Sequence, residues 1–237
     1  PGKPVELSAL WYDALCNLAR LADLVDRPGA KYVQWAQTTR ASFERFWNAE
    51  RGCCFDVLDG PHGNDPRVRP NQIFTVSLTH SPLSPERQRA VVDVCEQRLL
   101  TWFGLRSLAP GEGDYRGRYG GNRVQRDEAY HQGTVWGWLL GPFVLAHYRV
   151  YRDAARACQL LEPLLGQLWT SGVGTLSEIF DGDEPYTPHG CFAQAWSVAE
   201  TLRAWSVLHT MYTGDVGTER KAVQPRACPR AATLSQN

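Results

Sequence analysis

Residues 131–150 of this chain are apolar on nearly every side. The stretch reads HQGTVWGWLLGPFVLAHYRV, with tryptophan, leucine, phenylalanine and valine throughout. A helix that is apolar almost all round occurs where other helices cover it on several sides. The stretch therefore predicts an inner helix of a large helical domain, and 237 residues are enough to bury such a helix.

Most of the remaining chain has the period of amphipathic helices. Apolar residues recur at intervals of three and four in segments 4–26, 30–48, 85–100 and 153–169. The first of these predicts a broad buried face, made of Leu7, Leu10, Trp11, Ala14, Leu15, Leu18, Leu21, Ala22 and Val25. Shorter or less regular patterns predict helices at 71–78 and 191–212.

Successive helices with short connections predict an all-α fold built from helical hairpins arranged as a toroid. We count roughly seven helices, whereas a six-hairpin (α/α)6 barrel has twelve. The architecture is therefore either smaller or part of a barrel whose other helices lie outside this chain. We expect residues 1–212 to form this domain and residues 213–237, which have few apolar anchors, to be a disordered tail.

Two segments interrupt the helical pattern. Residues 52–59 are short and β-like, and a loop over residues 60–66 follows them. Residues 103–127 predict a long irregular segment with six glycines. Loops of this length inside a compact domain are usually functional, and the tyrosines and arginines of this one supply groups that can pack and bind.

Charge and composition restrict the classes of partner and cofactor that we expect. Lys plus Arg and Asp plus Glu are both 25, so nothing favours nucleic acid or an anionic membrane as a partner. No apolar run reaches the roughly 20 residues that span a bilayer. The histidines and the seven cysteines lack metal-ligand spacing, so we expect no metal or cofactor, and reduced thiols in a cytoplasmic protein. Nine tryptophans and nine tyrosines fill a core or, alternatively, stack on sugar rings.

Acidic residues concentrate in one loop, within the stretch GVGTLSEIFDGDEPYTPHGCFAQAWSVAE over residues 172–200. Glu178, Asp181, Asp183 and Glu184 lie within seven positions, between glycines and prolines. Such a loop suits carboxylate chemistry, although acidic loops also serve only solubility.

Three other segments combine polar and aromatic residues at expected helix starts: residues 2–6 with Trp11, residues 69–72, and residues 126–136. In a helical toroid such segments can converge at one end and line a funnel. Each also has a structural explanation, since Glu6 could complement a helix dipole, Asn71 could cap a helix and His131 could be a satisfied core residue. No motif of acyl or phosphoryl transfer is present, whereas glycoside hydrolysis requires two carboxyl groups.

The segments KPVELSALWYDAL, RPNQIFTVSL, GLRSLAP, RDEAYHQGTVWGWLLGPF and SEIFDGDEPYTPHGCFAQAWSVAE together resemble the C-terminal part of the glycogen debranching enzyme family. That part is an amylo-α-1,6-glucosidase domain, an (α/α)6 barrel. The resemblance runs from Gly2 to about Leu208. It implies hydrolysis of α-1,6-linked glucose at the branch points of glycogen or a branched α-glucan, with inversion at the anomeric carbon.

The resemblance also assigns roles to residues. Glu178 matches the family's general base, which activates the attacking water, and Asp181 and Asp183 are secondary candidates. The resemblance implies that the remaining candidates contact sugar: Tyr130, His131, Gln132, Trp136, Lys3, Glu6, Trp11, Asn71, Asp127, Gln194 and Trp196.

The sequence departs from the family pattern in one important respect. The family's general acid is an aspartate in a Trp-Gly-Arg-Asp-Thr type motif upstream of the KPVE segment, and this chain contains no such motif. We therefore expect the N-terminal part of the same enzyme to supply the acid. Two alternatives remain: a non-catalytic helical module that at most binds α-glucan, and an (α/α) barrel hydrolase that acts on a different glycan.

Overall fold

The computed structural model describes residues 2–218, which fold into eight α-helices with short 3₁₀ turns and short strands. The helices are α1 Val5–Leu24, α2 Ala30–Phe43, α3 Phe74–Ser77, α4 Pro85–Arg98, α5 Arg123–Ala129, α6 Leu140–Tyr151, α7 Ala154–Leu165 and α8 Ala195–Thr218. The 3₁₀ turns are η1 Glu44–Phe46, η2 Pro70–Ile73, η3 Gly137–Leu139 and η4 Gly166–Trp169.

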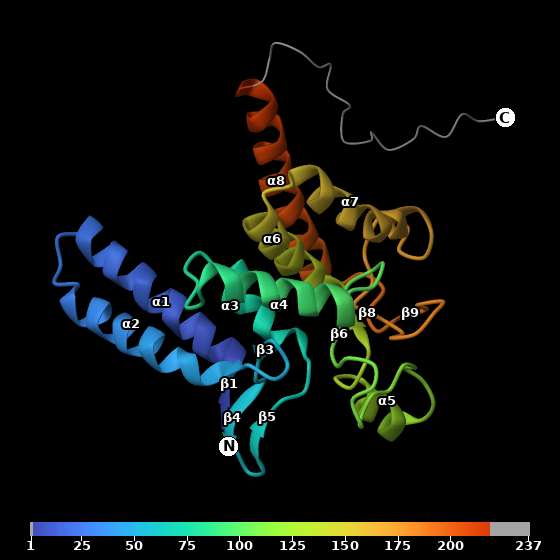
Figure 1. Ribbon diagram of the computed structural model, residues 1–237. Helices are drawn as coiled ribbons and strands as arrows, with labels where there is room; N and C mark the ends of the chain where they lie inside the picture. The colour runs from blue at the N-terminus through green and yellow to red at the C-terminus, as the bar shows by residue number, and fades with distance from the viewer. Residues whose placement is uncertain (1, 219–237) are drawn as a thin grey trace.

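Helices α1, α3, α6 and α8 contact one another in that order and form one row (Figure 1). Helix α2 packs against α1, α4 against α3 and α6, and α7 against α6 and α8. The core includes Phe43, Ile73, Phe143 and Leu161, each at most 2% exposed. The predicted all-α fold of paired helices is therefore confirmed.

Short strands connect the helices and form three small antiparallel sheets. One contains β1 Lys3–Pro4, β4 Val57–Gly60 and β5 Gly63–Asp65; a second contains β2 Trp47–Asn48 and β3 Cys53–Cys54. The third joins β6 Leu105–Arg106, β7 Val135–Trp136, β8 Ile179–Phe180 and β9 Pro188–His189, in that order. This last sheet brings three segments together: the glycine-rich segment (residues 103–127), the YHQG segment (residues 126–136) and the acidic loop within residues 172–200.

Several boundaries differ from the prediction. The helix expected from residue 131 begins at Leu140, because Val135 and Trp136 pair with β8 as a strand. The second helix ends at Phe43 rather than near residue 48, where the chain pairs with β3. The loop expected over residues 60–66 contains β5, and the irregular segment ends in α5. Pairing with another strand overrides the local pattern in the first three cases, and capping at the start of α5 overrides it in the fourth.

The C-terminal helix α8 runs to Thr218, beyond the expected end near residue 212. The rest of the expected disordered tail, residues 219–237, lies outside the described residues. None of the helices over residues 2–218 is long and apolar enough to cross a membrane.

The broad buried face predicted for the first helix is largely wrong. Of its members only Leu15 and Ala22 are buried, while Ala9 and Tyr12, which the prediction did not include, are buried instead. Several large apolar side chains of α1 and the following turn face solvent, namely Leu7, Leu10, Trp11, Leu18, Leu21, Leu24 and Val25. Helix α1 is at the end of the row formed by α1, α3, α6 and α8, so it has an inner neighbour on one side only among the described residues. We call these exposed side chains the α1 stripe.

We predict that the isolated chain self-associates through the α1 stripe, because exposed apolar patches of this size favour association. Replacing Leu18 and Leu21 with glutamine should shift the sedimentation-velocity distribution toward monomer. Replacing Arg20 with glutamine, an exposed change between them, serves as the control. A monodisperse wild-type monomer at the same concentration would contradict the prediction.

Candidate active site

A cavity of about 510 Å³ opens where the N-terminal ends of several helices meet. Glu6 comes from the first turn of α1, Asn71 from η2, and Trp196 from the first turn of α8. The other lining residues are Asp56, Arg69, Pro70, Phe74, Ser107, His131, Gln132, Trp136, Trp138 and Leu139. The expected convergence of the separate segments at one end of the helical array is therefore observed.

A buried polar cluster forms one wall of the cavity. The Asn71 amide donates to Asp56 at 2.8 Å, and the Arg69 guanidinium lies 3.7 Å from the other Asp56 oxygen. Burial raises the pKa of Asp56, while the Asn71 hydrogen bond and the Arg69 charge oppose that rise. The pKa of Glu6 is also raised, by burial first and by the nearby charge of Asp56 second. Two carboxyl groups therefore face the same enclosed space.

Arg69 ties this wall to the YHQG segment. Its guanidinium donates to the backbone oxygens of Ser107 and His131, at 2.9 and 2.6 Å, and to the Gln132 side chain at 2.6 Å. Burial and the Arg69 charge lower the pKa of His131. The imidazole of His131 is thereby favoured in its neutral form, which can both donate and accept a hydrogen bond.

Aromatic rings form another part of the lining. Trp138 and Trp196 stack with ring centroids 4.0 Å apart, and His131 and Trp136 stack at 5.3 Å with parallel planes. The Trp136 indole donates to the Tyr130 backbone oxygen at 3.1 Å, which fixes the ring. Flat apolar faces beside hydrogen-bonding side chains are suited to a pyranose ring, which has apolar faces and a polar rim.

Glu178 immediately precedes β8 and is not one of the lining residues, but it contacts Tyr130, which packs on the lining residue Trp136. The pairing of Trp136 with Ile179 places Glu178 next to η3, although the two segments are far apart in sequence. The Tyr130 hydroxyl donates to one carboxylate oxygen, and the Cys191 backbone N–H donates to the other at 2.8 Å. The Tyr130 ring in turn contacts Trp136 at 4.7 Å. Glu178 is half-buried, so its carboxylate is oriented but still within reach of water.

Glycine at position 190 is required by this arrangement. Gly190 has a φ of 71°, and a Cβ atom there would lie 2.4 Å from a carboxylate oxygen of Glu178. A side chain would thus displace the carboxylate as well as strain the backbone.

Asp181 is buried and has a different environment from Glu178. It accepts hydrogen bonds from Arg118 at 3.1 Å and from the Tyr119 N–H at 2.8 Å, and it lies 3.1 Å from His189. These contacts join the glycine-rich segment to the acidic loop. Asp183 similarly accepts from Tyr115 at 2.8 Å. Both side chains are therefore occupied in holding loops together.

The remaining sequence candidates lie apart from the cavity lining. Lys3 pairs with Asp59 on the surface, and Trp11 belongs to the α1 stripe. Asp127 is 71% exposed, 3.7 Å from Arg123. Gln194 is half-buried, and its backbone N–H donates to Leu176. Within residues 2–218, no cluster of histidine, cysteine and carboxylate side chains has an arrangement that could hold a metal ion.

Several lining residues were not singled out from the sequence, and Asp56 and Trp138 are the two that matter most for the site. Asp56 lies in a β-like segment whose alternation gave no sign of chemistry, and its role depends on contacts with residues 69–71. Trp138 was counted as part of the apolar helix, whereas it lies in η3 and faces Trp196. Of these two residues, only Trp138 could have been inferred from the sequence, because it lies two residues after the candidate Trp136.

Solved structures that resemble this chain show its fold. A family 63 mannosylglycerate hydrolase from Thermus thermophilus, in complex with glucose, has a TM-score of 0.64 at 19% identity, over 87% of this chain and 47% of that chain. A neutral trehalase from Saccharomyces cerevisiae has a TM-score of 0.59 at 13% identity, over 91% of this chain and 40% of that one. A family 15 glucoamylase from Hypocrea jecorina has a TM-score of 0.54 at 16% identity, over 89% and 42%. The chain therefore has the fold of six-hairpin α/α-toroid glycosidases and spans under half of each structure.

Sequence comparison is more specific. The glycogen debranching enzyme of Saccharomyces cerevisiae is 25% identical over 196 residues, which cover 67% of this chain and 13% of that enzyme. The chain thus spans only a small part of the curated relative that it matches. The sequence profile of the amylo-alpha-1,6-glucosidase family matches residues 1–203. With most of its length matched, this chain belongs to the amylo-alpha-1,6-glucosidase family of glycoside hydrolases.

Proposed function

We propose that this chain contributes the general base and much of the sugar-binding wall of an amylo-α-1,6-glucosidase. In this proposal the enzyme removes α-1,6-linked glucose at the branch points of glycogen or a similar α-glucan, with inversion. The observation that carries the proposal is the position of Glu178, a carboxylate held by Tyr130 and Cys191, with the Tyr130 ring packed on Trp136 of the cavity lining.

The proposed reaction needs a water between Glu178 and the anomeric carbon. Glu178 takes a proton from this water as the water attacks, while a carboxylic acid on the other side of the bond protonates the leaving oxygen. The two carboxyl groups of an inverting enzyme are about 6.5–9.5 Å apart, which leaves room for the water. We assign the acid to a segment outside these 237 residues, corresponding to the family's aspartate motif.

The sugar ring would lie in the cavity, in contact with both the aromatic and the polar side chains of its lining. Trp136 offers a face for stacking, and His131, Gln132 and Asn71 offer hydrogen-bond donors and acceptors. The carboxyl group of Glu6 would accept from sugar hydroxyls, which replaces part of the hydration that burial removes. Trp138 and Trp196 would contact a neighbouring unit of the glucan.

The stereochemistry of the product tests this proposal. A longer polypeptide, in which the family's preceding half-barrel is joined to this chain, should release glucose from an α-limit dextrin. Proton NMR during the first minutes should show β-glucose as the initial anomer. α-Glucose as the initial product, or release from linear α-1,4 chains at the same rate, would contradict the proposal.

A second candidate, a non-catalytic α-glucan-binding module, is favoured by the partly exposed Trp138–Trp196 stack. Affinity electrophoresis of the 237-residue chain in gels with and without glycogen measures such binding. Glycogen retardation, together with no glucose release from the longer polypeptide described above, would favour this candidate over the glycosidase.

We predict that replacing Tyr130 with phenylalanine lowers kcat about tenfold or more and leaves KM nearly unchanged. The change removes the hydroxyl that donates to Glu178 but keeps the ring against Trp136. Hydrogen bonds to charged groups contribute about 1.5–3 kcal/mol, which corresponds to this loss. Steady-state kinetics and the Tm should be measured together, with Tyr115→Phe, at an Asp183 contact, as the control. An unchanged kcat would show that Tyr130 does not position the base.

A further inference from the structure

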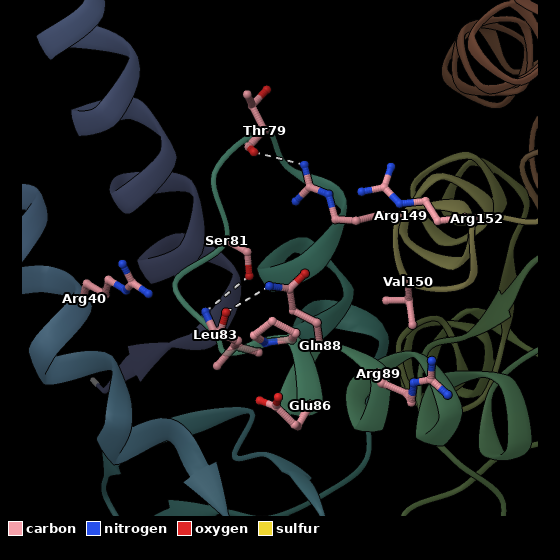
Figure 2. A pocket seen from close by; sticks show the side chains of 11 residues that line it. Arg40, Thr79, Ser81, Leu83, Glu86, Gln88, Arg89, Arg149, Val150 and Arg152 are labelled. Carbon is pink, nitrogen blue, oxygen red and sulfur yellow. Dashed lines mark hydrogen bonds between the residues drawn. The ribbon is translucent and has the colours of Figure 1, made fainter. Parts of the chain in front are cut away.

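A second cavity, of about 800 Å³, lies at the other end of α6 from the candidate active site. Its walls come from α2, the segment that follows α3, the first turns of α4 and the C-terminal end of α6 (Figure 2). The lining residues are Arg40, Thr79, Ser81, Leu83, Pro85, Glu86, Gln88, Arg89, Arg149, Val150 and Arg152. None of them lines the first cavity. The two cavities lie at opposite ends of α6, whose twelve residues span roughly 18 Å at 1.5 Å per residue.

Four arginines give this cavity a strong positive charge. Arg40, Arg89, Arg149 and Arg152 line it with a single carboxylate, Glu86, although the whole chain is neutral. Among the side chains that the structure describes, residues 2–211, no acidic group lies within ion-pair distance of any of the four guanidinium groups, although Asp13 is near enough to Arg149 to act on its charge. A net positive charge of this kind attracts anions from solution, and concave walls strengthen the attraction.

Two of the arginines are held in place by the fold. Arg149 donates to the backbone oxygens of Val76 and Thr79, at 2.6 and 2.9 Å, so its guanidinium is fixed at the cavity wall. Arg89 lies 5.0 Å from the Tyr151 ring centre. A fixed guanidinium binds an anion with less loss of side-chain entropy than a mobile one.

The other two arginines are available to a ligand. Arg40 on α2 and Arg152 just after α6 are exposed, and neither side chain donates to another described residue. In Figure 2, Arg40 extends into the cavity from one side, while Arg149 and Arg152 come from the opposite side. The cavity therefore has guanidinium groups on two sides, one from α2 and the others from the C-terminal end of α6.

We propose that this cavity binds a phosphorylated sugar through its phosphate group. Guanidinium groups match phosphate with paired, charge-assisted hydrogen bonds, and this match distinguishes phosphate from neutral sugars. The volume falls within the range of small-molecule sites and leaves room beyond the phosphate. Thr79 supplies a hydroxyl group and Gln88 an amide oxygen there for sugar hydroxyls, while the Gln88 amide nitrogen donates to the Leu83 backbone oxygen.

The form of the charge favours a small anion over a polymer. Nucleic acid is bound by basic residues spread along an extended face or groove. Here four arginines line one concavity in a chain with equal numbers of acidic and basic residues. This site is separate from the proposed glycosidase site, so its test does not depend on glucose release.

Calorimetric titration of the 237-residue chain with glucose 6-phosphate, inorganic phosphate and glucose tests the proposal. We expect glucose 6-phosphate to bind more tightly than inorganic phosphate, and its dissociation constant to rise with sodium chloride. The double variant Arg40→Gln with Arg152→Gln should weaken glucose 6-phosphate binding about tenfold or more. The matched control, Arg20→Gln with Arg27→Gln, removes two exposed arginines of α1 and the turn after it, and should leave binding unchanged.

Several results would overturn the proposal. They are no binding of glucose 6-phosphate by the wild type, equal binding by the double variant, or an equal loss in the control. Inorganic phosphate that binds as tightly as glucose 6-phosphate would remove the sugar from the assignment. Far-UV circular dichroism and Tm of each variant show whether the fold is intact, and the salt dependence of the wild type gives a readout that needs no variant.

Discussion

Replacing Glu178 with glutamine is expected to lower kcat for glucose release roughly 10²–10⁴-fold, with a small effect on KM. Glutamine keeps the shape of the side chain and one acceptor oxygen for Tyr130 or Cys191. It cannot accept a proton from the attacking water. The loss should therefore fall on the chemical step, measured as glucose released from an α-limit dextrin by the longer polypeptide described above.

The same loop provides a matched control for this variant. Glu184 is an exposed carboxylate six positions further on, and its side chain makes no hydrogen bond or ion pair with another described residue. Glu184→Gln removes the same charge and should retain activity. A Glu178→Ala variant that regains turnover with azide as an added nucleophile, and forms the β-glucosyl azide, would identify the lost function as base catalysis. Near-normal activity of Glu178→Gln would refute the role.

Replacing Gly104 with alanine is expected to destabilise the fold by about 3 kcal/mol or more. A Cβ atom at this buried position would lie 2.2 Å from the backbone oxygen of Trp136 and 2.8 Å from its carbonyl carbon. Backbone atoms cannot move aside as a side chain can, so β6 and β7 would have to separate. The Tm should fall by about 6–12 °C for a domain of this size, measured by calorimetry or circular dichroism.

Gly120 is the control for this second prediction. It belongs to the same glycine-rich segment, but an added Cβ atom there would have no heavy atom within 4 Å. Gly120→Ala should therefore leave the Tm nearly unchanged. Because Trp136 also lines the cavity, Gly104→Ala should weaken glucan binding even at temperatures where the variant is folded. Equal Tm values for the two variants would contradict the argument.

The period of three and four residues predicted most of the helices, but it could not say which faces are covered. Leu18 and Leu21 satisfy the pattern of a buried face, yet they are exposed on α1. Leu15 and Ala22 satisfy it and are buried. The difference depends on which neighbouring helices are present, and a local pattern carries no information about that.

Strands were the least predictable elements. Val135 and Trp136 lie in an apolar run that favours helix, but β7 forms because β6 and β8 supply hydrogen-bonding partners. Those partners are distant in sequence, so local propensity does not contain them. The sheet matters for the site, because it sets Glu178 beside Tyr130 and Trp136.

The sequence by itself determined that this chain is a helical domain with an acidic loop and an aromatic YHQG segment, because these features depend on local composition and period. Only the tertiary structure decided which residues meet. It joined Glu178 to Tyr130, brought Asp56 and Arg69 to the cavity, and gathered Arg40 and Arg152 around a second one. These contacts depend on how helices pack and strands pair between residues that are far apart in sequence. Local sequence patterns therefore do not predict them.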